Sequence, residues 1–272
     1  MPDTPSFTAQ ALTIKIDAPH ELQADGAAVL DRLARLVGFT AIGLPILLAV
    51  GTVIAAGCFR DSISHFYHTQ FMGGVFVGLL FFIGGFMIAY TGASWLERVG
   101  STIAGLCAFG VALFPTAGSG CEGQETFLSR VFVEVTQAPA GGPPYTFGQG
   151  DVFGQSYFSL FGAASEYHMA FAGAVFVYLG LFCLFVLRRV IPAKHGEGPS
   201  MIATKRRRNT LYFWCGVVIL VCVGVLALKG RLVGDLTSWD ALNLTFWVEA
   251  VALWAFGLAW ITKGRIFKAL ND

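Results

Sequence analysis

Six long apolar stretches constrain this chain more than any other feature of its sequence. Each is close to the roughly 20 residues that a helix needs to cross a hydrocarbon core of about 30 Å. Only 13% of the residues are charged, against about 25% in an ordinary soluble domain. The sequence therefore predicts an all-α polytopic membrane protein, built as a six-transmembrane-helix bundle. The stretches cover residues 36–59, 71–90, 99–117, 167–187, 211–228 and 242–261.

The distribution of basic residues predicts which side of the membrane each loop faces. If the stretches alternate in direction, 14 of the 18 Lys and Arg residues fall on one side, together with both termini. Cytoplasmic loops carry an excess of Lys and Arg. We therefore expect a multi-pass protein of the cell inner (plasma) membrane with both termini cytoplasmic. The four basic residues on the outer side are Arg60, Arg130, Lys229 and Arg231.

The chain is expected to form one membrane domain, residues 36–268. Residues 1–35 are predicted to be a cytoplasmic lead-in on the membrane surface, with a short interfacial helix over 21–35. Residues 118–166 form one long outer loop, which exceeds the roughly 12–15 residues beyond which loops usually carry structure or function. We expect this loop to be structured. Its aromatic part, residues 147–161, has two interpretations. It forms a lid or a lipid-binding rim, or it packs over the helix ends.

The basic run 205–208 favours a lipid-headgroup anchor beside a span over a nucleic-acid site, so no nucleic-acid partner is expected.

Of the six cysteines, Cys58 and Cys121 are the two near the outer ends of spans. Such a pair can form a disulfide in an oxidising compartment. The alternative is two unrelated thiols.

Polar and ionisable residues gather at the outer ends of the spans. Residues 61–68 read Asp-Ser-Ile-Ser-His-Phe-Tyr-His between the first two stretches. His168 begins the fourth stretch from the same side, and Glu249 lies about two turns into the sixth. Ionisable residues within spans are rare and mark functional sites. A carboxylate at that depth needs a partner or must take a proton. We expect His65 or His68 to cluster with His168 and Glu249, because histidine is the obvious partner; the alternative is a neutral Glu249 bonded to a backbone carbonyl or a hydroxyl.

Three histidines and a water are a common catalytic zinc set, and zinc lowers the pKa of that water to about 7. Asp61 or Glu249 would orient a ligand or act as a base, and Ser62 or Ser64 would hydrogen-bond a water or a substrate carbonyl. Two other interpretations stay open: a hydrogen-bonded plug that ties the helix ends together, and binding of a lipid headgroup or ion without metal. The candidate zinc ligands are His65, His68 and His168.

Several short motifs carry a resemblance to known proteins. They are Ser-Ile-Ser at 62–64, Ala-Leu-Phe-Pro-Thr at 112–116, His168 with the segment 170–178, Arg-Arg-Arg-Asn at 206–209, and the segments 246–250 and 254–257. The chain resembles a six-helix group of uncharacterised bacterial membrane proteins, similar in layout to the DRAM/Frag-like proteins. The resemblance covers roughly residues 36–263 and implies the fold more than an activity.

A more distant similarity rests on Ser64, Asp61, His168 and either His65 or His68. In kind, this set is similar to that of the CREST superfamily, which includes alkaline ceramidases and adiponectin-receptor-like proteins. Those are seven-helix, zinc-dependent lipid amidases that use three His, an Asp and a Ser near one membrane face. This chain has six predicted helices, and Glu249 stands in the last helix, where those proteins carry an HxxxH pair.

Two functions are therefore expected. The first is an integral membrane scaffold or accessory subunit that binds lipid, or other membrane protein subunits, at its outer face. The second, implied by the CREST resemblance, is a membrane-embedded, zinc-dependent hydrolase of a lipid amide or ester. A transporter with a carboxylate–histidine proton relay is less well supported, because the sequence lacks an internal repeat or broken-helix pattern.

Overall fold

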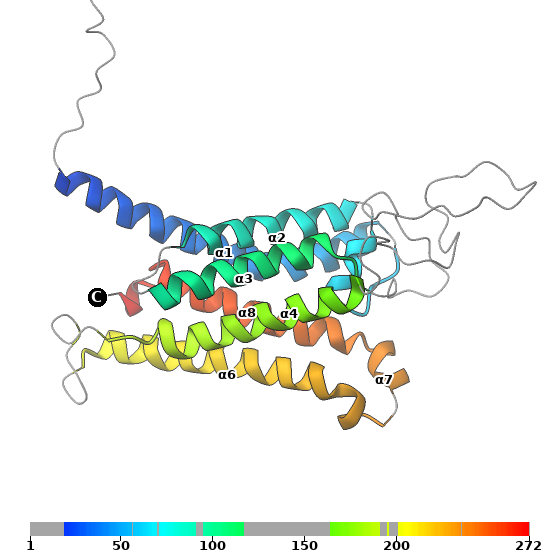
Figure 1. Cartoon of the computed structure of the whole chain (residues 1–272). Coiled ribbons are helices and arrows are strands. Elements are labelled where there is room, and N and C mark those ends of the chain that lie inside the picture. Colours follow the sequence, from blue (N-terminus) through cyan, green and yellow to red (C-terminus); the bar gives the residue numbers. More distant parts are fainter. Residues whose placement is uncertain are drawn as a thin grey trace, which may run out of the picture.

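The structure is a computed structural model that describes residues 19–55, 57–69, 71–90, 95–116, 164–190, 195, 201–234 and 236–271. Within these residues every regular element is a helix. Six of the helices are long and apolar enough to cross a membrane, and they lie side by side along their lengths (Figure 1). The predicted all-helical architecture with six membrane spans is confirmed.

The bounds of the long helices differ from those of the apolar stretches: one helix extends past its stretch at both ends, four extend past theirs at one end, and one agrees to within a residue. The helix predicted over 21–35 is present as the first part of one continuous helix, which begins at Pro19 and runs on through the first span. The long helices are α1 (Pro19–Ile54), α2 (Phe71–Ala89), α3 (Trp95–Leu113), α4 (Ala164–Leu181, continued by the π-helix η2, Phe182–Val186), α6 (Ala203–Leu232) and α8 (Leu244–Lys263). The short ones are η1 (Ser64–His68), α7 (Leu236–Ala241) and η4 (Lys268–Leu270).

The long helices form a closed ring in chain order. Each of α1, α2, α3, α4 and α6 contacts the next long helix, and α8 returns to contact α1. Glycines permit two of these contacts. A Cβ on Gly38 would lie 2.8 Å from the Gly257 carbonyl oxygen, and one on Gly105 would lie 2.6 Å from that of Gly84. Such close backbone approaches are common where membrane helices meet at small residues.

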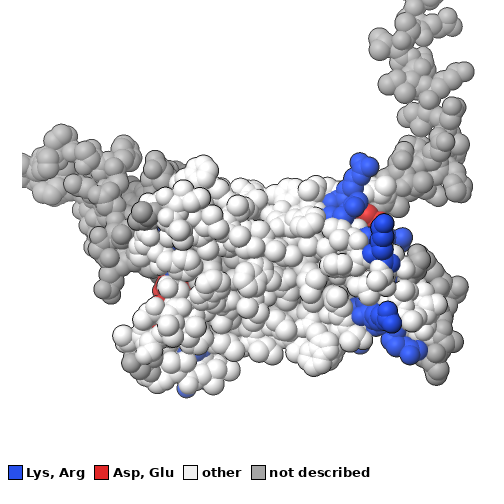
Figure 2. Space-filling view, turned by 180° about the vertical axis from the view of Figure 1, so that it is seen from behind, with Lys and Arg blue, Asp and Glu red and all other residues white. Residues whose placement is uncertain are grey.

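The two ends of the bundle differ in charge. Lys and Arg side chains gather at one end of the molecule (Figure 2). The start of α1 and the C-terminal residue also lie toward this end (Figure 1). There Arg189 forms an ion pair with Glu97, and Lys263 donates a hydrogen bond of 2.9 Å to the Tyr90 hydroxyl. The opposite end carries η1 and α7 (Figure 1).

Several predictions fall wholly or partly outside the described residues. Most of the expected outer loop, up to residue 163, is among them, and so is Cys121. Cys58 is disulfide-bonded. The cysteines within the helices are free thiols, namely Cys107, Cys183, Cys215 and Cys222.

Candidate functional site

The segment between α1 and α2 folds into the end of the bundle. Backbone hydrogen bonds of 3.2 Å from His65 N–H to the Ser62 carbonyl, and from Phe66 N–H to the Ile63 carbonyl, make a tight turn. Ile63, Phe66 and Tyr67 are buried, with exposed fractions of 4%, 1% and 2%. These apolar side chains anchor the turn in the bundle, where Ser62 and His68 are also buried, whereas Asp61, Ser64 and His65 are partly exposed. We refer to residues 61–68 as the polar turn.

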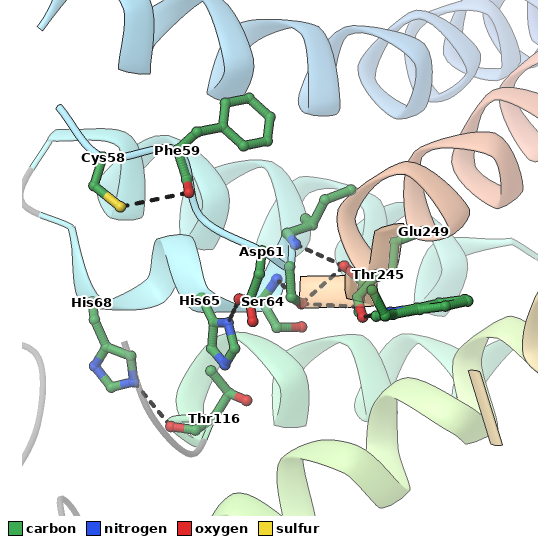
Figure 3. A network of polar contacts seen from close by, with 12 residues as sticks. Cys58, Phe59, Asp61, Ser64, His65, His68, Thr116, Thr245 and Glu249 are labelled. Carbon is green, nitrogen blue, oxygen red and sulfur yellow. Dashed lines mark hydrogen bonds and ion pairs between the residues drawn. The ribbon is translucent and has the colours of Figure 1, made fainter. Parts of the chain in front are cut away.

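Glu249 of α8 is bound directly by the polar turn (Figure 3). The Ser62 hydroxyl lies 3.1 and 3.0 Å from the two carboxylate oxygens, and the Ile63 N–H donates to one of them at 2.7 Å. One turn earlier on α8, the Phe246 N–H donates to the Asp61 carbonyl oxygen at 2.7 Å. These hydrogen bonds offset the cost of placing a carboxylate inside a membrane bundle.

The hydrogen-bond partners of Glu249 therefore differ from the expected histidine. Among the described residues, a serine hydroxyl and a backbone amide hold this carboxylate. A turn that presents an N–H toward a carboxylate needs no charged partner, because hydrogen bonds to the charged form stabilise it. Ser62, rather than Ser64, is the serine that binds Glu249. The Ser62 oxygen also accepts the Ser64 N–H at 3.2 Å.

Asp61 and His65 form a hydrogen-bonded pair in the polar turn. Nδ1 of His65 lies against the Asp61 carboxylate, four residues earlier (Figure 3). The hydrogen bond from His65 lowers the pKa of Asp61 below its usual value, against the opposing effect of partial burial. Both side chains remain partly exposed, at 17% for His65 and 25% for Asp61. The pair therefore lies at the solvent-facing edge of the site.

The other two histidines bind the C-terminal end of α3. Nε2 of His68 is 2.9 Å from the Thr116 carbonyl oxygen, and Nδ1 of His168 is 2.7 Å from the Phe114 carbonyl oxygen. The last carbonyls of a helix lack partners within it, and Pro115 lies between these two residues and cannot continue a regular helix. A carbonyl oxygen only accepts, so the facing nitrogen of each ring carries the proton.

Both of these imidazoles are buried, with exposed fractions of 1% for His68 and 0% for His168. Burial lowers the pKa of His68 to about 4, in part opposed by the hydrogen bond to Thr116. The ring is thus neutral at physiological pH. Tyr67 adds a third cap at the same helix end, because its hydroxyl donates to the Leu113 carbonyl oxygen at 3.2 Å.

The three histidines fit the chemistry of zinc ligands in one respect. Metal-bound histidine usually donates its second ring N–H to a carboxylate or a backbone carbonyl, and His65, His68 and His168 each have one ring nitrogen against such an oxygen. Nε2 of His168 is buried without a hydrogen bond to the described residues. However, no group of three or more His, Cys, Asp or Glu within the described ranges is close enough to hold a metal ion. The zinc site stays a prediction.

An apolar cavity lies beneath the polar turn. Its volume is about 70 Å³. Of the described residues that line it, Ser64 and Glu249 are polar and the others are apolar. On α8 the lining runs from Glu249 to Phe256, a depth of about 10 Å at 1.5 Å per residue. The apolar lining residues are Leu44, Ile63, Phe76, Leu80, Ile83, Ala108, Val111, Ala172, Val175, Phe176, Leu179, Leu253 and Phe256.

The chain matches no family model, no curated protein and no solved structure in the comparisons made. The resemblance to the DRAM/Frag-like group and the more distant one to the CREST superfamily therefore stay predictions from short motifs.

Proposed function

We propose that this protein is an integral membrane scaffold or accessory subunit that binds a lipid chain inside its helix bundle. The observation that carries the proposal is the apolar cavity, which has Ser64 and Glu249 at its polar end. The polar turn fixes both residues, because Ser62 and Ile63 hold the carboxylate and the Ser62 oxygen accepts the Ser64 N–H. The arrangement is a polar group above an apolar compartment, as a lipid requires.

Energetics favour an occupant. At about 24 cal/mol per Å³, an empty cavity of 70 Å³ costs roughly 2 kcal/mol of stability. Hydrocarbon inside the cavity would recover part of that cost through dispersion contacts. In a bilayer the apolar molecules at hand are lipid chains, so a lipid is the natural ligand of this compartment.

The charge difference between the ends supports a membrane orientation. By the positive-inside rule, the basic end of Figure 2 faces the cytoplasm. The polar turn and the cavity mouth then lie at the extracytoplasmic face of the inner membrane, as the sequence predicts.

Lipid that co-purifies with the full chain tests the proposal. The protein is purified in detergent, and its lipids are extracted and quantified by mass spectrometry. Ala172 lines the cavity, so Ala172→Leu fills part of it and should lower the retained lipid several-fold. Ala227 lies on an exposed part of α6, and Ala227→Leu serves as the matched control that should retain lipid. Equal lipid in all three proteins contradicts the proposal.

A second candidate is the metal-dependent lipid hydrolase. The observation that favours it is the shared geometry of three imidazoles, each with one nitrogen against an acceptor oxygen. Elemental analysis of protein purified without chelators separates the two candidates. About one zinc per chain, lost in His168→Gln, supports the hydrolase. Zinc at background level in the folded wild-type protein removes it.

A further inference from the structure

We propose that the occupant of the cavity is a lipid with one alkyl chain whose polar end is an uncharged hydrogen-bond donor, such as a hydroxyl. This inference rests on the proposed lipid-binding function and adds the chemical class of the ligand. It follows from three properties of the cavity: the acceptors at its polar end, the charges around that end, and its narrow apolar body.

The polar end offers acceptors to a ligand. The Glu249 carboxylate takes hydrogen bonds from the Ser62 hydroxyl and the Ile63 N–H. A carboxylate has about four lone-pair sites, so it can accept a further donor from the cavity side. Ser64 also lines this end, and its hydroxyl can both donate and accept. A ligand hydroxyl matches this pair, because it can donate to Glu249 and accept from Ser64.

The charges around the polar end disfavour an anionic ligand. Among the residues that the structure describes, the cavity lining contains no Lys or Arg. The cationic or titratable neighbours of Glu249 are His65 and Lys229, and each has another partner. His65 is paired with Asp61, and Lys229 donates to the Thr245 hydroxyl oxygen at 3.2 Å. A fatty-acid carboxylate or a phosphate would therefore meet a carboxylate of the same sign in a partly desolvated site.

The body of the cavity is suited to a single chain. Phe76, Phe176 and Phe256 contribute rings to its wall from three different helices. Its depth of about 10 Å and its volume of about 70 Å³ describe a small apolar space. The end of one unbranched chain fits such a space, whereas the two chains of a diacyl lipid do not.

A binding comparison between two probes of equal chain length tests the inference. The purified full chain in detergent is titrated with radiolabelled dodecan-1-ol or dodecanoate at pH 8. The wild-type protein should bind the alcohol at least 10-fold more tightly. Glu249→Gln removes the negative charge and keeps an acceptor oxygen, so it should raise the affinity for dodecanoate and bring the ratio close to one. Ala172→Leu should weaken both probes, and Ala227→Leu should weaken neither.

The possible failures are distinguishable. If the wild-type protein binds dodecanoate and the alcohol with equal affinity, the headgroup inference is overturned and the lipid site remains. The same holds if Glu249→Gln leaves the ratio of the two affinities unchanged. If neither probe binds the wild-type protein, the lipid-binding function itself fails. If Glu249→Gln does not fold, Ser64→Ala takes its place, with several-fold weaker binding of the alcohol expected and Ser64→Thr as the variant that restores it. Unchanged binding in Ser64→Ala then overturns the headgroup inference.

Discussion

Ser62 and Glu249 are separated by 187 positions in the chain, yet the serine hydroxyl lies 3.1 and 3.0 Å from the two carboxylate oxygens. The contact joins the segment that follows the first membrane helix to the last membrane helix. Because α1 and α8 are neighbours in the ring, this contact closes the ring at the end of the bundle opposite the basic end. The close approach of Gly38 and Gly257 joins the same two helices nearer the basic end.

Substitutions at Glu249 should separate its hydrogen bonds from its charge. Glu249→Gln keeps an acceptor for Ser62 and Ile63, so the thermal stability in detergent should stay close to that of the wild type. Glu249→Leu leaves the hydroxyl and the N–H without an acceptor, at a cost of about 1–3 kcal/mol for each buried group. Equal unfolding temperatures for the Leu variant and the wild type would show that these hydrogen bonds do not stabilise the bundle.

The stability should fall in mild acid because His68 is buried. Burial lowers its pKa from 6.5 to about 4, so between these values the unfolded chain binds a proton that the folded chain does not. Stability therefore decreases as the pH falls from 6.5 toward 4. The full effect is on the order of 3 kcal/mol, at 1.36 kcal/mol per pKa unit.

Unfolding in detergent at pH 7.5 and at pH 5 measures this loss. His68→Gln keeps a donor for the Thr116 carbonyl and does not titrate, so it should lose less stability than the wild type over the same interval. Asp61 does not confuse the comparison, because its hydrogen bond to His65 lowers its pKa below the ordinary value of 3.8 and it stays ionised. Parallel pH dependence in the two proteins contradicts the assignment to His68.

Hydropathy locates the membrane helices, but their ends depend on other forces. The sequence predicts a span over residues 211–228, whereas α6 runs from Ala203 to Leu232. The added first turns contain Lys205 and Arg208, which are buried, with exposed fractions of 5% and 9%. Lys and Arg are good helix formers, and their stems cover apolar surface while the charge reaches an acceptor or water. A window that scores apolar residues cannot include them.

The positions of the site residues were more predictable than their partners. Topology predicts that the polar turn and Glu249 lie at one end of the bundle, and the structure joins them through hydrogen bonds. The sequence does not identify the backbone N–H of Ile63 as the donor, because every residue except proline has a backbone N–H. The acceptor at Phe114 is likewise a backbone carbonyl, and the only signal for it in the sequence is Pro115.

The predicted disulfide can be tested by a peptide mass map of the non-reduced protein. Cys58 is disulfide-bonded, and we expect the map to show a peptide that links it to Cys121. In the chain-entropy model, a bridge that closes a loop of about 60 residues stabilises the fold by a few kcal/mol, so reduction should lower the unfolding temperature. Free thiols at both positions would exclude the bridge.

The proposed orientation can be tested with two single-cysteine additions. In intact cells, an impermeant thiol reagent should label Gly150→Cys and should not label Thr4→Cys until the membrane is opened. The reason is the excess of Lys and Arg on the side of the termini. Wild-type protein gives the background from native thiols. Labelling of position 4 together with protection of position 150 means that the topology is inverted.

The most direct test of the central claim is to locate a bound alkyl chain by photo-crosslinking. A fatty alcohol with a diazirine at mid-chain is bound to the full protein, irradiated, and mapped by peptide mass spectrometry, with and without excess dodecan-1-ol. The account predicts competitor-sensitive crosslinks to residues that line the cavity on three helices, such as Phe76, Phe176 and Leu253. Crosslinks confined to outward-facing residues such as Phe185 and Val221, which are 67% and 57% exposed, would contradict it.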